Sequence, residues 1–351
     1  MQYIVLDLEW NQSPTGKKNT VSEIPFEIIQ IGAVKLDSNF NIIDEFNMNI
    51  RPQVYMKLHS KVEEVVSVTI QELLETGVEF EKGACEFIDW CGNNYIFCTW
   101  GSMDITEFER NMAYYKIENN FEKPLLFYDL QKLFSICFSD GKTRITLEHA
   151  IEQLGINSDE QYHRAVNDAR YTAKVMQHLD MNRAGKYYSV DTFRIPANRK
   201  EQIYLDFGDY GKFISKGFET REDAVVDRDV RSCKCFKCKK SMKKHIKWFA
   251  TNSKTYYGLF SCEKHGLIKG RFKAKQADNG LFYVVKILKC TDEYGAEKVK
   301  AKQEKERLHR KMRAEKKLRI SNNNIYIINY KGTVILRNFI QNIMSCMNFL
   351  V

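Results

Sequence analysis

Two acidic residues near the N-terminus lie where a strand is expected to be buried. Asp7 and Glu9 fall within residues 3–10, which are apolar on both strand faces and predict a central strand. Side chains two residues apart on a strand point to the same face, with their Cα atoms about 6.6 Å apart. Two buried carboxylates repel each other and lose hydration, so a bound cation would stabilise the pair. The alternative is that the strand end emerges into solvent, where both acids are harmless.

A third acid, Asp104, opens a predicted helix that follows the strand-like residues 95–100. It shares one helix face with Phe108 and Met112, at spacings of four and eight residues, and that face is expected to be buried. The alternative is a first-turn acid that only complements the helix dipole.

His163 and Asp168 stand at the start of a second predicted helix, residues 164–179. Small residues form a stripe on this helix (Ala165, Ala169, Thr172 and Ala173). They would let the helix approach the sheet closely and bring Asp168 toward the first strand. His163 precedes the helix proper and can stand in a loop over the same spot; taken alone, it would be a surface histidine.

The elements that must position these residues are strands followed by alternating strands and helices. The predicted strands are 3–10, 26–37, 41–50, 95–100 and 125–130, and helices are predicted after 104 and 130 and over 145–154 and 164–179. This order predicts an α/β domain with a mixed sheet.

Together, the D-x-E strand, the later aspartate and the H-x4-D helix resemble the DEDDh 3′→5′ exonucleases of the ribonuclease H-like superfamily. Supporting matches are EIIQIGAVKLD after the first motif, TWGSMDITEFERN around Asp104 and LEHAIEQLG before the last motif. The resemblance covers residues 1–182. It implies a ribonuclease H-like mixed sheet flanked by helices, and it is strongest to bacterial relatives of the RNA-trimming and sporulation-kinase-inhibitor exonucleases.

The resemblance also implies a two-metal site with Mg²⁺ or Mn²⁺. Asp7, Glu9 and Asp168 would hold the ion that carries the attacking water, while Asp7 and Asp104 would hold the second ion. His163 would be the general base, a task that suits an imidazole because it titrates near neutral pH.

Trp10 departs from the resemblance, because many members have a small hydroxyl residue at this position. The indole could stack on a terminal base of a single strand. The favoured alternative is core packing on the other face of the strand.

A second group of residues has the spacing of a zinc site. Cys235 and Cys238 form one C-x2-C pair, and Cys262 and His265 form a C-x2-H pair further along. Two thiolates and a Cys/His pair supply the four tetrahedral ligands of a structural Zn²⁺. Cys233 is an alternative to Cys235, and the opposing interpretation is chance thiols with a surface histidine.

Lysines and aromatic rings surround this cysteine cluster, as a single-strand binder requires. The candidate nucleic-acid residues there are Lys237, Lys239, Lys240 and Trp248. For each of these residues, the alternative of equal weight is a solvated lysine face that lies over a small aromatic core.

Charge divides the chain. Residues 1–180 carry 16 Lys+Arg against 28 Asp+Glu, a net of −12, whereas residues 233–320 carry 26 against 8, a net of +18. A basic segment of this kind usually binds the phosphate groups of nucleic acid or of anionic lipid. We therefore expect an exonuclease domain at 1–182, a connecting segment at 183–232, a small zinc-ribbon-like basic domain at 233–290, and a basic helix with an Asn/Ile-rich tail at 291–351.

The tail lacks acids and is a candidate apolar docking segment. The N-terminus has no basic region of a signal peptide, and no stretch reaches the roughly 18 apolar residues of a spanning helix. The ten cysteines do not form the even framework of a small secreted domain, and a reducing cytoplasm is expected.

The sequence thus predicts a metal-dependent exonuclease that hydrolyses single-stranded nucleic acid from a free 3′ end, with RNA favoured over DNA as the substrate, and releases nucleoside 5′-monophosphates. No membrane association is expected, because the basic helix lacks a broad apolar face. The competing hypothesis is a catalytically silent nucleic-acid-binding or regulatory protein with the same fold. Nothing in the sequence identifies a protein partner.

Overall fold

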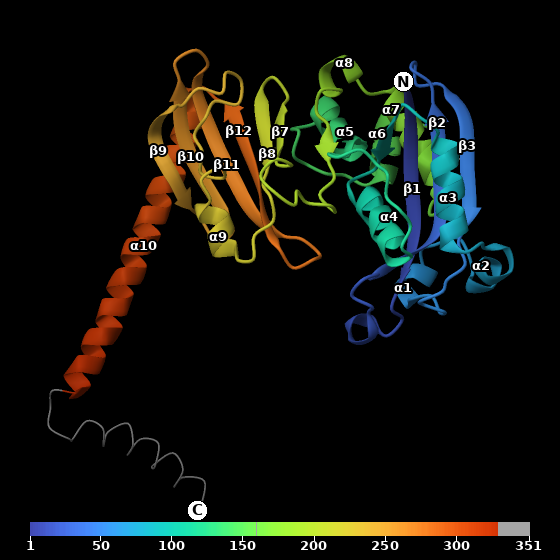
Figure 1. The fold of residues 1–351 in the computed structure, drawn as a ribbon, viewed down its shortest axis with the longest axis horizontal. Helices are drawn as coiled ribbons and strands as arrows, with labels where there is room; N and C mark the ends of the chain where they lie inside the picture. The colour runs from blue at the N-terminus through green and yellow to red at the C-terminus, as the bar shows by residue number, and fades with distance from the viewer. Residues whose placement is uncertain (159, 329–351) are drawn as a thin grey trace, which may run out of the picture. The chain divides into compact units, whose positions relative to one another are not determined.

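The computed structural model describes residues 1–158 and 160–328, and the chain divides into two units. The first comprises Met1–Pro196 together with Ala277–Asn279, and the second comprises Ala197–Gln276 with the described residues from Gly280 onward. In Figure 1 the first unit runs from blue to green and the second from yellow to red.

The first unit is built on a six-stranded mixed sheet in the order β3-β2-β1-β4-β5-β6. Its strands are β1 (Gln2–Gln12), β2 (Phe26–Leu36), β3 (Ile42–Asn49), β4 (Tyr95–Thr99), β5 (Leu126–Asp129) and β6 (Ser189–Val190). The first three pair antiparallel, β1 pairs parallel with β4 and β4 with β5, and β6 returns antiparallel. The predicted mixed α/β fold is confirmed.

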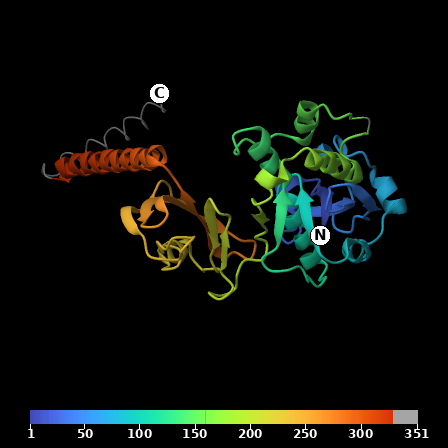
Figure 2. The same ribbon diagram turned by 90° about the horizontal axis from the view of Figure 1, so that it is seen from above.

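Helices cover both faces of this sheet because the central strand is apolar on both sides. On one face, Val5 of β1 joins a core with α5 (Leu130–Phe138), α6 (Leu147–Leu154) and α7 (Ala165–Gln177). On the other, Ile4 and Leu6 join a core with α3 (Phe80–Cys91) and α4 (Met103–Tyr114). Figure 2 shows these two groups of helices on opposite sides of the blue strands.

Short helices complete the described part of the first unit. They are the 3-10 helix η1 (Gly16–Asn19), α1 (Ser60–Glu63), α2 (Ile70–Thr76) and α8 (Met181–Ala184). The left-handed Gly155 ends α6, in agreement with the helix predicted over 145–154.

The second unit is a six-stranded sheet in the order β7-β8-β12-β11-β10-β9, with antiparallel neighbours throughout. Its strands are β7 (Ile203–Asp206), β8 (Tyr210–Ile214), β9 (Lys243–Ala250), β10 (Thr255–Cys262), β11 (Gly266–Gln276) and β12 (Phe282–Cys290). The helix α9 (Arg221–Val226) lies between β8 and β9 in the chain.

Part of the segment expected to connect the domains therefore belongs to this sheet. Residues 203–214 form β7 and β8, and β8 pairs with β12, which lies about 70 residues later. The predicted basic helix begins at Glu293 and continues to Ile328 as α10. The rest of the Asn/Ile-rich tail, from 329, lies outside the described residues. Across residues 1–158 and 160–328, no helix combines the length and apolarity needed to cross a bilayer.

Candidate functional site

Asp7 and Glu9 lie on the face of β1 that meets α7. Val5, two residues before Asp7, packs in the core that contains α7, and strand alternation continues this face through Asp7 and Glu9. A β-bulge follows, because the register with β2 shifts between Glu9 and Trp10. Both carboxylates thus point toward the helix that carries Asp168.

Gly32 of β2 lies directly opposite Asp7 and lets α7 come close to the sheet. A Cβ at this position would lie 2.1 Å from both the carbonyl carbon of Ala165 and the amide nitrogen of Val166. Since both are backbone atoms, only glycine fits here. No sequence motif indicated Gly32, although a glycine inside an otherwise apolar strand is itself a signal of close backbone approach.

Asp104 is buried in the first turn of α4 and reaches β1 through a hydrogen bond. The backbone amide of Leu8 donates to its Oδ1 at 3.3 Å. The pairing between β1 and β4 ends at Val5 and Cys98, so Asp104 takes the place of a strand partner beyond that point. Asp104 is therefore fixed beside the strand segment that carries Asp7 and Glu9.

His163 and Asp168 are held together through the backbone. The amide of His163 donates to Asp168 Oδ2 at 3.0 Å, and His163 adopts a left-handed φ of 62°. The amide of Ser67 donates to the His163 carbonyl at 3.0 Å and anchors the loop from the other side. Ser67 is a second positioning residue that no sequence motif indicated.

These elements bring three of the predicted side chains to one point. One oxygen each of Glu9 and Asp168 and one ring nitrogen of His163 all lie within 4.8 Å of one another. Asp168 Oδ1 is buried and has no hydrogen-bond partner among the described residues. A buried carboxylate oxygen without a donor is available to a cation.

The electrostatics place Asp7 and Asp104 in the same cluster. Burial raises the pKa of Asp7 well above its ordinary value, and the charge of Asp104 is the next cause. The charges of Glu9 and Asp168 raise the pKa of Asp7 further. Burial, followed by the charges of Asp168 and Asp104, raises the pKa of Glu9 to about 8.

The other two carboxyls follow the same pattern. Burial raises the pKa of Asp104 to about 7, against hydrogen bonds from its own amide and that of Leu8. Burial raises the pKa of Asp168 to about 6, against the hydrogen bond from His163.

The donor set fits divalent metal ions. Carboxylate oxygens are the ligands that Mg²⁺ and Mn²⁺ prefer. The mutual repulsion that raises the pKa of Asp7 and Glu9 is what a divalent cation would relieve. The unpartnered Oδ1 of Asp168 is consistent with a metal ligand.

The two tryptophans considered as nucleic-acid contacts, Trp10 and Trp248, pack in hydrophobic cores. Trp10 is half-buried beside Phe26, with ring centroids 5.9 Å apart, and packs with the α3–α4 side of the sheet. Trp248 stands over Gly258 and Gly270 and packs with aromatic rings of the second unit. Both positions agree with the alternatives given for these residues, which are core packing for Trp10 and a small aromatic core for Trp248.

Lys237 and Lys240 are exposed, as a surface contact with nucleic acid requires. The ammonium of Lys239 instead donates to the backbone carbonyl of Phe236. It therefore helps to close the turn that carries Cys235 and Cys238.

The second unit brings the four predicted zinc ligands together. Cys235 Sγ lies 3.4 Å and Cys262 Sγ 3.5 Å from His265 Nδ1. The thiols of Cys238 and Cys262 are also 3.5 Å apart. Such separations suit a tetrahedral ion with bonds of about 2.0–2.3 Å.

The thiol of Cys233, the alternative ligand, is directed to the Arg231 carbonyl at 3.3 Å and lies outside this group. Burial opposes ionisation of Cys262. Hydrogen bonds from the Lys264 amide and the His265 side chain nevertheless lower its pKa to about 6, which favours the thiolate that a metal binds.

Comparison with known proteins agrees with the geometry of the first unit. Residues 4–176 match the model of the RNase_T family, described as Exonuclease. These residues form an exonuclease domain of the DEDDh family. The family depends on divalent metal, in agreement with the carboxylate cluster.

The curated relatives are longer proteins. The exonuclease domain is 27% identical over 176 residues to the PolC-type DNA polymerase III of Clostridium perfringens, covering 50% of this chain and 11% of the relative. It is 28% identical over 178 residues to the PolC-type polymerase of Thermotoga petrophila, covering 49% and 11%. The chain thus spans about a tenth of the length of these relatives.

Solved structures of nucleases are similar to part of the chain. One is the nuclease domain of 3′hExo, a DEDDh family member bound to rAMP, with a TM-score of 0.45, 19% identity and coverage of 54% of this chain and 96% of the other. Another is Escherichia coli exonuclease I in complex with a dA16 oligonucleotide, with a TM-score of 0.42, 14% identity and coverage of 67% and 59%.

Proposed function

We propose that the exonuclease domain removes nucleotides one at a time from the 3′ end of single-stranded nucleic acid and releases nucleoside 5′-monophosphates. The observation that carries the proposal is that Glu9, Asp168 and His163 meet at one point and that Asp7 and Asp104 interact electrostatically with the same acids. RNA is the favoured substrate, on the basis of the sequence resemblance to RNA-trimming relatives.

The four carboxylates would hold two Mg²⁺ or Mn²⁺ ions. When bound, the ions supply Lewis-acid stabilisation of the negative charge that develops at the scissile phosphate. Asp7 faces the other three acids and would be shared between the ions. Asp104 is oriented by the Leu8 amide and Asp168 by the His163 amide, so neither acid has to reorganise when metal binds.

His163 would accept the proton of the attacking water. Its loop is fixed on one side by Asp168 and on the other by Ser67, which limits the positions available to the imidazole. A base held within reach of the nucleophile contributes typically about 10²–10⁴-fold to the rate.

The second unit would bind the nucleic acid and hold one structural Zn²⁺ through Cys235, Cys238, Cys262 and His265. Its positive charge complements the acidic exonuclease domain, which by itself repels a polyanion. We also place the protein in the cytoplasm; the nine free thiols of the described cysteines support a reducing compartment.

The experiment is cleavage of matched single-stranded RNA and DNA with Mg²⁺ or Mn²⁺, with products resolved nucleotide by nucleotide. We expect a ladder that shortens from the 3′ end, faster on RNA, and no cleavage in excess chelator. Asp7→Asn should be inactive, while the matched control Asp89→Asn, a surface acid on α3, should behave as the wild type. Binding of both oligonucleotides without any metal-dependent cleavage would favour the silent regulatory alternative.

A further inference from the structure

One face of the sheet of the second unit is lined by buried aromatic and aliphatic side chains. Phe260, Ile268, Phe272 and Val284 are buried on it, and the Trp248 ring fills the space above Gly258 and Gly270. The segment that carries Cys235 and Cys238 packs on the same face. This face is a hydrophobic core that encloses the zinc ligands.

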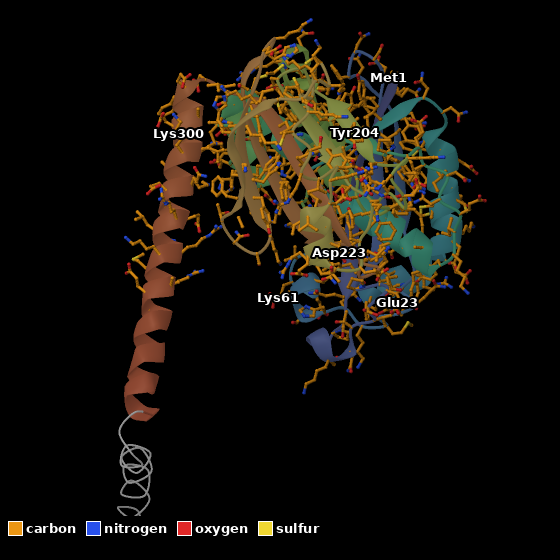
Figure 3. All side chains as sticks on the ribbon, turned by 60° about the vertical axis from the view of Figure 1, so that its left-hand side comes forward. Met1, Glu23, Lys61, Tyr204, Asp223 and Lys300 are labelled. Atoms are coloured by element: carbon orange, nitrogen blue, oxygen red, sulfur yellow. The ribbon has the colours of Figure 1, made fainter. Side chains whose placement is uncertain are left out.

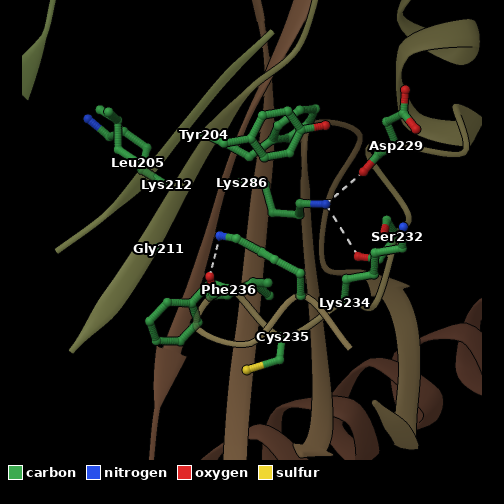
Figure 4. A pocket seen from close by; sticks show the side chains of 13 residues that line it. Tyr204, Leu205, Gly211, Lys212, Asp229, Ser232, Lys234, Cys235, Phe236 and Lys286 are labelled. Atoms are coloured by element: carbon green, nitrogen blue, oxygen red, sulfur yellow. Dashed lines mark hydrogen bonds between the residues drawn. The ribbon is translucent and has the colours of Figure 1, made fainter. Parts of the chain in front are cut away.

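A cavity of about 330 Å³ opens beside this segment and contains the buried ammonium of Lys286. Figure 4 shows Lys286 directed to the loop of Asp229 and Ser232. Its Nζ donates to the carbonyls of Asp229, Val230 and Ser232 at 2.7, 2.9 and 3.3 Å. Three carbonyls occupy the three donors of an ammonium, so Lys286 secures the loop and has no donor left for a ligand.

The opposite face of the same sheet carries cations. Along β11, buried Ile268, Gly270, Phe272 and Ala274 alternate with charged residues, and Lys269, Arg271 and Lys273 form one row on the outer face. We refer to these three residues as the cationic row. Neighbours in the row are two residues apart, or about 6.6 Å along the strand.

The cationic row is not neutralised within the described protein. None of its three side chains forms an ion pair or hydrogen bond with a described residue, and Arg271 and Lys273 are exposed. Lys289, directly opposite Lys269, pairs with Asp209 at 3.6 Å. Like charges on one strand face are unfavourable unless an anion offsets them.

The helix α10 borders the cationic row on this face. Ala296 and Val299 pack against Ile246 and Leu259, and Leu259 is the β10 neighbour of Lys269. Further along α10, the ammonium of Lys302 lies 4.2 Å from the ring centroid of Tyr257, which stands directly opposite Arg271. Figure 3 shows the side chains of α10, with Lys300 labelled, extending outward from the helix.

We propose that the cationic row, with Lys302 beside it, binds the phosphate backbone of a single-stranded nucleic acid, so that the interface lies on the face of the sheet that carries this row rather than at the zinc-binding segment. This inference rests on the proposed function. An extended strand carries one negative charge per nucleotide and matches a straight row of fixed cations. The apolar neighbours Val285 and Ile287 are half-buried, so the face offers little apolar surface to a lipid bilayer.

The test compares two variants of the full-length protein that lose equal charge. The row variant combines Lys269→Gln, Arg271→Gln and Lys273→Gln. The matched variant combines Lys234→Gln, Lys237→Gln and Lys240→Gln, three exposed lysines around the first cysteine pair. Binding to a labelled single-stranded oligonucleotide of about 20 nucleotides is followed between about 50 and 200 mM salt, without added Mg²⁺ or Mn²⁺.

We expect the row variant to flatten the log–log salt dependence of binding by about 2, since each phosphate contact on a single strand contributes about 0.7. The matched variant should change the slope less than the row variant. The single substitution Arg271→Gln should lower the slope by about 0.7 and serves if the triple variant is unstable. A row variant with the wild-type slope, a larger effect of the matched variant, or preferential binding of the wild type to vesicles of anionic lipid would overturn the inference.

Metal-dependent cleavage of a short oligonucleotide is measured in parallel. This measurement is made on the wild type and reports on the catalytic cluster, which lies in the other unit. A wild-type protein that does not cleave the oligonucleotide, but whose binding still depends on the cationic row, would contradict the proposed function. The inference that the cationic row binds nucleic acid would then still hold.

Discussion

At Asp7, burial and the charges of three neighbouring carboxyls act together to raise the pKa. After burial, the charges of Asp104, Glu9 and Asp168 raise the pKa of Asp7, so Asp7 interacts electrostatically with all three of the other acids. His163, by contrast, is in contact with Glu9 and Asp168 at one edge. The two residues should therefore differ in how much activity depends on them.

We predict that Asp7→Ala lowers the single-turnover rate more than His163→Ala does. Loss of Asp7 should remove both metal ions, whereas loss of a general base costs typically about 10²–10⁴-fold. Rapid-quench rates of the two variants at saturating Mn²⁺ give the comparison. A His163→Ala protein that is slower than Asp7→Ala would contradict these roles.

The raised pKa values also predict how pH acts on the metal-free protein. The pKa of Glu9 is about 8 and that of Asp104 about 7, both above the value of about 4 for an unfolded carboxyl. Between these limits the folded state binds more protons at these two carboxyls than the unfolded state, so their contribution to stability is full at low pH and is lost as pH rises toward 8.

Bound metal should offset that loss, because it stabilises the ionised carboxylates of the folded state. Thermal unfolding at pH of about 5 and about 8, with and without Mn²⁺, is the measurement. We expect a larger gain in Tm from Mn²⁺ at the higher pH, and a much smaller difference in the Glu9→Gln, Asp104→Asn double variant. An equal gain at both pH values in the wild type would count against a carboxylate metal site.

At the scale of elements, the contact between α7 and β2 sets the geometry of the site. Gly32→Ala should destabilise the protein and lower its activity, because the new methyl group meets backbone atoms of α7 at 2.1 Å. Overpacking of a core costs typically about 1–3 kcal/mol, and backbone that cannot move aside puts this site at the upper end.

Gly83→Ala is the matched control. The nearest atom to its added methyl is the end of the Ile50 side chain, and α3 lies on the other face of the sheet. Urea unfolding and turnover of both variants test the idea. An active, fully stable Gly32→Ala protein would show that α7 does not need this close approach.

The cysteine and histidine ligands should behave as a unit. We predict about one zinc per chain by metal analysis of the full-length protein, and its loss in Cys238→Ser. Cys233→Ser should retain the metal, because that thiol is directed to the Arg231 carbonyl. A zinc-free wild type with an intact second unit would end this assignment.

These elements also show what the sequence could and could not predict. Strand alternation and the small-residue stripe placed Glu9 and Asp168 toward each other, because both patterns are local. The contact of Gly32 with Ala165 joins segments more than 130 residues apart, and the pairing of β8 with β12 is also long-range. Local patterns carry little information on such partners.

Trp248 illustrates a further limit. An aromatic residue among lysines has the sequence pattern of a nucleic-acid contact, yet bulges in the pairing of β9 with β10 turn its ring toward the core. The lysine-rich segment around Cys235 and Cys238 and the cationic row on β11 are both strongly basic, so composition alone does not separate them. The register of β11 decides which of its side chains lie on the buried face of the sheet and which lie on the opposite, charged face.

At the scale of the whole molecule, charge and chemistry are carried by different units. Residues 1–196 contain every proposed catalytic residue, and the second unit contains the basic residues of the sheet and α10. We predict that a chain ending at Pro196 retains kcat on short oligonucleotides but shows a higher KM and a flatter salt dependence on long ones. The steady-state constants at two salt concentrations test this, and an unchanged KM would assign the second unit to another partner.

The central claim is that the carboxylate cluster hydrolyses the terminal phosphodiester at a 3′ end. The most direct measurement is the first product released from single-stranded RNA labelled on its 3′-terminal nucleotide, in Mn²⁺, by the wild type and by Asp7→Asn. The account predicts that the wild type releases the label first, as a nucleoside 5′-monophosphate, and that Asp7→Asn releases none. Labelled fragments longer than one nucleotide, or the same release by Asp7→Asn, would contradict it.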